Sequence, residues 1–230
     1  MRLPFLLSVP HAGWKIPPEV EDICILSKKE VLMDGDEGAS EIYCPLENKV
    51  AAFVTTDIAR AIVDLNRAED DFRKDGIIKT HTCWDVPVYR TEPSTALIET
   101  LIKKYYRPYH KKIESLASNV KLGIDAHTMA AFGPPVGPDQ GKKRPLVCVS
   151  NANFTCPESW INSFAECLED SLGLPVSINT PFLGGYIIRS YSKKIPWIQI
   201  EYSRVPFLDY EQKSNALLMA LSKWLLFLVK

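Results

Sequence analysis

The sequence lacks an apolar run as long as a membrane-spanning helix requires. Its most apolar segment, NALLMALSKWLLFLVK, contains Lys223 and falls short of the roughly 20 residues needed. The segment MRLPFLLSVPHAG has Pro4 within its apolar part and no small-residue cleavage site, so we do not expect a secretory signal. We therefore expect a cytoplasmic protein without a membrane partner.

An excess of charge of one sign is also missing. Lys and Arg number 27 and Asp and Glu number 28, so no overall field favours binding of nucleic acid. The six cysteines contain no C-x-x-C pair, which is typical of reduced, mostly buried thiols. We find no internal repeat and no domain boundary, so we expect one domain over residues 1–230 whose partner is a small molecule.

Short apolar runs alternate with longer helical patterns along the chain, which favours an α/β fold with a parallel or mixed sheet. We expect strands over residues 3–9, 59–65, 121–126, 145–150, 174–179 and 196–202, with 186–191 as a possible further strand.

The expected helices have recognisable starts or ends. They are a short helix after the capping box of Ser27, one over about 38–52, a long one from Ser94 kinked at Pro108, one between Pro157 and Gly173, and one near the carboxyl end. Residues 130–144 are rich in Gly and Pro and show no periodicity, which is typical of a functional or mobile loop.

Polar residues follow four of the apolar runs at the point where each run ends. Residues just past the carboxyl ends of strands meet in one crevice of an α/β sheet, so we expect these residues to share a site. The run ends are SVPHAG, IVDLNR, GIDAHT and IQIEYSR, which carry His11, Asp64, Asn66, Arg67, Asp125, His127, Glu201 and Arg204.

Two imidazoles with a carboxylate form a donor set typical of zinc. His11 and His127 are the candidate histidine ligands, and Asp125 would orient His127 from behind, compete as a ligand or belong to a turn. The spacing does not fix the third ligand, and we take Asp36 from an acidic set that comprises Glu19, Glu21, Asp22, Asp34, Asp36 and Glu37.

Glu201 is the candidate general base, because a carboxylate beside a metal-bound water can take a proton and pass it to a leaving amine. A salt bridge between Glu201 and Arg204 is the structural alternative. Asn66 and Arg67 form a candidate clamp for a substrate carboxylate, since a guanidinium binds a carboxylate through two hydrogen bonds.

Further binding residues are less closely defined. Arg189 and Arg204 are candidates for a second anionic group of the substrate. The glycines of the segment GGY permit close backbone approach, and Tyr186 is either a donor to a developing oxyanion or a core residue. His81 and His110 lack a partner cluster, so we expect His81 in a surface loop and a structural role for His110.

Six segments of the chain, SVPHAG, IVDLNR, RPYH, DAHTM, the GGY segment and IQIEYSR, occur in the order seen in N-formylglutamate amidohydrolases. The sequence resembles that family over nearly its whole length. The resemblance implies a single-domain α/β fold, with a mixed or parallel sheet flanked by helices, in the zinc-carboxypeptidase-like (phosphorylase/hydrolase-like) group. It also implies one divalent metal ion, with zinc expected.

The resemblance assigns roles to particular positions. His11 and His127 match the metal-binding histidines, and Asp36 in DEGASEIY matches an acidic position of the family. Asn66 and Arg67 match residues that bind a substrate carboxylate, and Glu201 matches the catalytic glutamate. One departure is Trp14, which stands where the carboxypeptidase pattern H-x-x-E would need an acid.

These patterns together predict a metal-dependent amidohydrolase that cleaves the N-acyl amide of an acidic amino acid. N-formyl-L-glutamate, cleaved to formate and glutamate, is the first candidate substrate. One alternative is a carboxypeptidase-like or amidase-like hydrolase acting on a peptide or cell-wall fragment. Another is a non-catalytic protein that binds a metal or an amino acid, against which an intact Glu201 argues.

Overall fold

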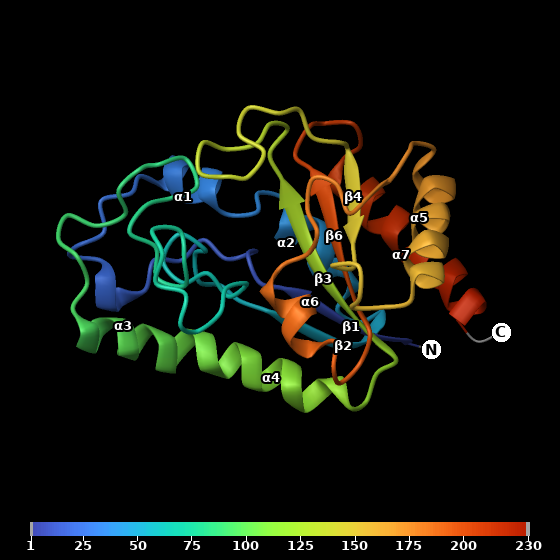
Figure 1. Cartoon of the computed structure of the whole chain (residues 1–230), viewed down its shortest axis with the longest axis horizontal. Helices are drawn as coiled ribbons and strands as arrows, with labels where there is room; N and C mark the ends of the chain where they lie inside the picture. The colour runs from blue at the N-terminus through green and yellow to red at the C-terminus, as the bar shows by residue number, and fades with distance from the viewer. Residues whose placement is uncertain (1, 229–230) are drawn as a thin grey trace.

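A six-stranded mixed sheet runs through the protein, which a computed structural model describes for residues 2–228 (Figure 1). The strand order is β2-β1-β3-β6-β4-β5, in which β2, β1, β3 and β6 are parallel and β4 is antiparallel to β6. The mixed sheet expected from the sequence is thereby confirmed. The strands are β1 Leu3–Val9, β2 Val50–Thr55, β3 Leu122–Met129, β4 Val147–Ser150, β5 Ser177–Ile178 and β6 Trp197–Ser203.

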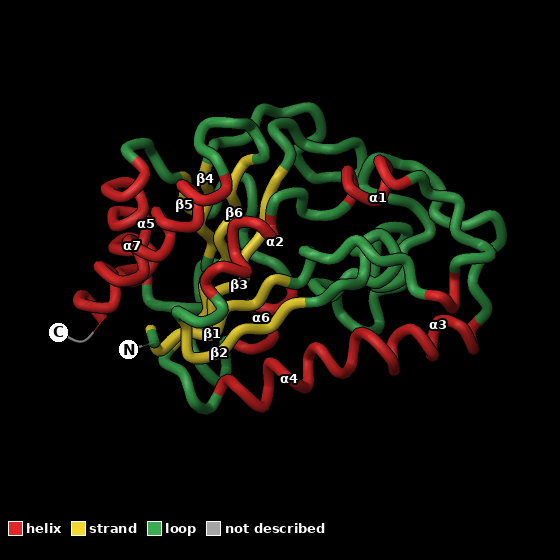
Figure 2. The backbone as a smooth tube through the Cα atoms, turned by 180° about the vertical axis from the view of Figure 1, so that it is seen from behind, coloured by secondary structure: helices red, strands yellow, loops and turns green. Residues whose placement is uncertain are grey.

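Helices cover both faces of the sheet (Figures 1 and 2). Helices α2, α5 and α7 pack with the odd-numbered apolar residues of β1, while α4 and α6 pack with the opposite face. Within residues 2–228, no helix is both long enough and apolar enough to cross a bilayer. The helices are α1 Lys28–Asp34, α2 Ala39–Tyr43, α3 Thr95–Leu101, α4 Arg107–Ala117, α5 Glu158–Leu172, α6 Tyr186–Tyr191 and α7 Tyr210–Leu228, with short 3-10 turns η1 Pro18–Val20 and η2 Cys44–Leu46 and the π-helical turn η3 Ile102–Tyr106.

Several helix ends follow from local hydrogen bonds that the sequence predicts. Ser27 and Glu30 form the capping box of α1, and the Ser94 hydroxyl accepts a hydrogen bond from the first turn of α3. Helix α5 ends at Gly173, whose φ of 69° is the left-handed conformation that glycine adopts without strain. The π-helical turn η3 stands just ahead of Pro108, where the long helix was expected to kink.

Three expected elements differ in the structure. Residues 59–65 form turns and no strand, because β2 occupies the place beside β1. The helix expected over 38–52 is α-helical only over Ala39–Tyr43, then becomes the turn η2 at Pro45 and gives way to β2. The possible strand over 186–191 is helix α6, whose buried residues Ile187 and Ile188 face the sheet.

The topology brings three parallel strand ends to one edge of the sheet. Strands β1, β3 and β6 are adjacent and parallel, so their carboxyl ends lie together. Two irregular segments, 56–94 and 130–144, extend beyond this edge and contribute residues to the cavity described below. The loops rather than the sheet therefore form much of its wall.

Candidate active site

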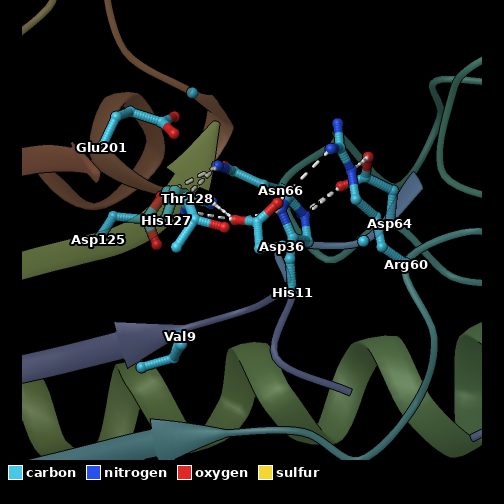
Figure 3. A network of polar contacts seen from close by, with 12 residues as sticks. Val9, His11, Asp36, Arg60, Asp64, Asn66, Asp125, His127, Thr128 and Glu201 are labelled. Atoms are coloured by element: carbon cyan, nitrogen blue, oxygen red, sulfur yellow. Dashed lines mark hydrogen bonds and ion pairs between the residues drawn. The ribbon is translucent and has the colours of Figure 1, made fainter. Parts of the chain in front are cut away.

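His11, Asp36 and His127 lie together at the carboxyl edge of the sheet (Figure 3). Their nearest ligand atoms all fall within 4.8 Å of one another, and each side chain is buried. Asp36 Oδ2 is 3.6 Å from His11 Nδ1 and 2.9 Å from His127 Nδ1. Two imidazole nitrogens and one carboxylate oxygen thus point toward one small volume.

The three residues come from different parts of the chain. His11 follows β1, and His127 lies within β3. Asp36 lies between α1 and α2, where its Oδ2 accepts a hydrogen bond from the Thr128 amide at 3.1 Å and its own amide donates to His11 O at 3.2 Å. The backbone of both histidine-bearing segments therefore positions the carboxylate.

Two further carboxylates hold the histidines from behind. His11 Nε2 donates to Asp64 Oδ1 at 2.8 Å, and His127 Nε2 donates to Asp125 Oδ2 at 2.8 Å. Ser8 donates in turn to Asp125 Oδ1 at 3.0 Å. Such contacts fix the ring orientation and direct Nδ1 of each histidine toward Asp36.

The residues present fit a metal ion. His11 Nδ1 is buried and has no hydrogen-bond partner within residues 2–228, although buried polar atoms are almost always paired. A cation bound by this nitrogen would complete its coordination. The donor set, two imidazoles and one carboxylate, is one that zinc takes in catalytic sites.

Two cations that no sequence pattern pointed to lie beside the Asp64 carboxylate. Arg60 Nε donates to Asp64 Oδ2 at 3.1 Å, and the ammonium of the fully buried Lys79 lies 3.7 Å from the same oxygen. Lys79 also donates to the buried Asp34 at 2.8 Å. Arg60 and Asp64 lie four residues apart, but the segment is not helical, so this spacing did not indicate their pairing.

These contacts determine the charge states of the site. Burial raises the pKa of Asp36 and Asp64, but the nearby histidines and, for Asp64, Arg60 more than compensate, so both pKa values lie well below the ordinary range. Burial lowers the pKa of His127, yet Asp125 and Asp36 bring it well above its ordinary value. Without a metal, Asp36 and Asp64 are therefore ionised, and His127 retains a proton.

Glu201 lies opposite His127 in the β3–β6 register and lines the same cavity. The carboxylate is buried, and burial raises its pKa to about 7. Gln199 donates to Glu201 Oε1 at 2.9 Å. In the described chain Glu201 forms no salt bridge with Arg204, which instead donates to the backbone carbonyl groups of Gly35 and Met33.

A cavity of about 460 Å³ opens onto these groups. Asn66 lines it, but its amide donates to Asp125 at 2.9 Å and accepts from the Ile187 amide at 2.8 Å. Gly185 approaches the same amide so closely that a Cβ atom would lie 2.4 Å from Asn66 Nδ2. The close backbone approach expected at the GGY segment is therefore made by Gly185 to the side chain of Asn66.

Of the arginines and the tyrosine expected to bind substrate, some line the cavity and others do not. Arg67 and Arg204 line the cavity. Arg189 is exposed on α6 and donates to Gly184 O, and it is not among the residues that line the cavity. Tyr186 is likewise outside the lining, with its ring packed edge-on against His110 at 5.8 Å between centroids.

The two remaining histidines lie outside this cluster. His110 is buried on α4 and hydrogen-bonds to Tyr191 and to Leu65 O, as a structural histidine would. His81 is half-buried in the irregular segment 56–94, in a bridge with Pro87. Neither histidine lines the cavity.

Comparisons with known proteins agree with this architecture. The chain is 24% identical over 224 residues to N-formylglutamate deformylase of Pseudomonas aeruginosa, covering 90% of this chain and 83% of that protein. The corresponding protein of Pseudomonas putida is 23% identical over the same length, with the same coverage.

Solved structures show the same fold. A crystal structure of N-formylglutamate amidohydrolase from Ralstonia eutropha JMP134 superimposes with a TM-score of 0.82 at 16% identity, covering 98% of this chain and 94% of that one. The gene product Atu2144 from Agrobacterium tumefaciens gives a TM-score of 0.76 at 16% identity, covering 99% and 92%. The family model for N-formylglutamate amidohydrolase matches residues 3–207, and this chain belongs to that family.

Proposed function

We propose that the protein is a metal-dependent amidohydrolase that cleaves N-formyl-L-glutamate to formate and glutamate. The observation that carries the proposal is the cluster of His11, Asp36 and His127 with the buried Glu201 beside it. The names of the Pseudomonas relatives suggest the substrate. The buried donor set and the unpaired His11 Nδ1 support the metal, with zinc as first candidate.

The metal would be held by His11 Nδ1, His127 Nδ1 and Asp36 Oδ2. When bound, a zinc ion lowers the pKa of a coordinated water and polarises a carbonyl group. Asp64 and Asp125 keep the two imidazoles oriented by accepting their Nε2 protons. In this role the two aspartates are positioning residues.

Glu201 is the proposed general base and acid. Gln199 occupies its Oε1, which leaves Oε2 to take a proton from the attacking water. The same carboxyl group then delivers that proton to the amine nitrogen as the C–N bond breaks, so the products are formate and the free amino acid. A pKa near 7 suits a group that must both accept and donate a proton.

Arg67 is the proposed ligand of one substrate carboxylate, because it lines the cavity beside the cluster. Asn66 acts indirectly in this proposal, since its amide holds Asp125 and the backbone of α6. Arg204 secures the segment that carries Asp36, with the two side chains 3.7 Å apart. Arg189 and Tyr186 have no role at the reacting atoms here.

The test is formate release from N-formyl-L-glutamate by protein loaded with one equivalent of zinc. We expect release that is abolished by a chelator and by His127→Ala, while His81→Gln retains activity because His81 does not line the cavity. Release that persists in His127→Ala would reject the assigned site. If zinc-loaded protein releases no formate, the assigned substrate is wrong and acylated peptides become the next substrates to test.

A further inference from the structure

Two arginines of the cavity wall are held by aspartates in a similar way. Arg67 donates through Nε and Nη2 to the backbone and side chain of Asp75, at 3.0 and 3.1 Å. Arg144 donates through Nε and Nη2 to the two carboxylate oxygens of Asp139, at 2.7 and 2.8 Å. Within residues 2–228, Nη1 of both arginines makes no hydrogen bond, so one edge of each guanidinium is free to bind a ligand.

Arg144 is fixed before any ligand arrives. Its guanidinium carbon lies 4.7 Å from the centroid of the Phe182 ring, and only 6% of its side chain is exposed. Its amide donates to Ala131 O at 2.9 Å, which ties together the two ends of the segment 130–144. A cation held in one orientation loses little conformational freedom on binding an anion.

The other two arginines of the cavity wall are engaged with the candidate metal cluster, since Arg60 and Arg204 lie 3.8 and 3.7 Å from Asp36. Arg60 donates to Asp64 and to Asp34 O, at 3.1 and 3.2 Å. Arg204 donates to backbone carbonyl groups of the segment that carries Asp36. Arg67 and Arg144 are thus the arginines of the wall whose Nη1 edge is available, and a dicarboxylate is the class of ligand that would use both.

We propose that Arg144 determines specificity by binding the side-chain carboxylate of an acidic N-acyl amino acid, through the guanidinium edge that Asp139 leaves free. This inference rests on the proposed function, in which Arg67 binds the other carboxylate. Asp139 acts as a positioning residue that holds the guanidinium fork. Arg144 also lowers the pKa of Glu201 by its charge, as expected for a cation near the general base.

The test compares N-formyl-L-glutamate with N-formyl-L-glutamine, which has the same shape but a neutral side chain. Wild-type protein should prefer the acid by at least about tenfold in kcat/KM. Arg144→Gln should lower kcat/KM for the acid by about 10- to 100-fold, mainly through KM, and change it for the amide less than about threefold. A thermal unfolding scan verifies that the variant folds.

Two further variants complete the experiment. Arg189→Gln removes a nearby arginine outside the cavity lining and should leave both substrates unchanged. If Arg144→Gln does not fold, Arg144→Lys decides, because a lysine keeps the charge but cannot bind Asp139 and the substrate through a planar fork. Its preference for the acid should be weaker than that of the wild-type protein, because the planar fork is lost while the charge remains, and an unchanged preference would overturn the role of Arg144.

The outcomes separate the two proposals. Wild-type protein that hydrolyses neither formyl compound contradicts the proposed function itself. An active wild-type protein with no preference for the acid, or an Arg144 variant that slows both substrates equally, overturns the role of Arg144 alone. Equal slowing of the two substrates is the result expected if Arg144 binds the α-carboxylate, which both of them carry.

Discussion

Two buried histidines of this protein, His127 and His110, have opposite ionisation behaviour although their side chains are similarly inaccessible, with relative exposures of 3% and 8%. His127 lies between Asp36 and Asp125, at 2.9 and 2.8 Å. These carboxylates overcome the effect of burial and bring its pKa well above the ordinary value. The imidazole faces negative charge on both sides.

His110 lies among aromatic rings instead. It accepts a hydrogen bond from the Tyr191 hydroxyl and donates to Leu65 O, and Tyr106 packs against it with 4.1 Å between ring centroids. Burial among these neutral groups lowers its pKa to about 4. The partners of a buried histidine, rather than its burial, thus decide whether it carries a proton or stays neutral.

The largest effect is expected from a substitution of Glu201, which lies in the same cavity as His127. Glu201→Gln keeps the shape but cannot take a proton, so formate release should fall by about 10²- to 10⁴-fold. The metal content, measured by atomic absorption, should stay at that of the parent. Normal turnover in the variant would remove Glu201 from the mechanism.

The pH profile tests the same carboxyl group. Burial raises the pKa of Glu201 to about 7, and the base must be deprotonated to act. The value of kcat/KM should therefore rise with pH up to a plateau, with an apparent pKa at or below about 7 because a bound cation lowers it. Glu201→Gln should lose this dependence, whereas an identical profile in both proteins would assign the titration to another group.

His110 should make the protein less stable in mild acid. Between its ordinary pKa of 6.5 and the folded value of about 4, the unfolded chain binds a proton that the folded protein does not. This group therefore costs about 3 kcal/mol of unfolding free energy as the pH falls through that window. Urea unfolding at pH 7 and at pH 5 should show a smaller decrease in His110→Gln than in the parent. Equal decreases would contradict the assigned pKa.

A smaller change is expected when the partner of His127 loses its charge. Asp125→Asn keeps an acceptor for His127 Nε2 but removes the carboxylate, so zinc affinity should fall by about 10- to 100-fold. Competition with a chromophoric chelator measures the change. His110→Gln is the matched control and should bind zinc like the parent, since His110 does not belong to the cluster.

The smallest expected effect is on the number of protons released when zinc binds. Since the pKa of His127 is raised in the metal-free protein, zinc must displace a proton at pH 7. Calorimetric titrations in two buffers of different ionisation enthalpy should report about one proton released per zinc ion. Asp125→Asn should release less, and an unchanged count would show that Asp125 does not control the protonation of His127.

Much of the site was foreseeable from short sequence patterns. His11 and His127 follow or end apolar runs that do form β1 and β3, so their meeting follows from the parallel pairing of these strands. Glu201 was expected at the end of a strand and lies in β6, opposite His127. Parallel strands bring their carboxyl ends together whatever the loops do.

Other parts could not be predicted in this way. The run ARAIVDL is mostly apolar and its residues other than Arg60 are buried, yet it forms turns, because burial alone does not distinguish a strand from a packed loop. Asp64 nevertheless reaches His11 from this loop. Lys79 and Arg144 carry no local signal of their roles, since their partners are known only once the loops are folded.

Local sequence patterns were enough for the α/β class and for the capped helix starts at Ser27 and Ser94, because these depend on hydrogen bonds and periodicities between near neighbours in the chain. Contacts between distant segments were needed to select the acid that faces His11 and His127. Asp36 was one of several acids close together in sequence, and it lies between the histidines because the Thr128 amide and the His11 carbonyl hold that turn there. Such contacts join residues far apart in the chain, so no local pattern contains them.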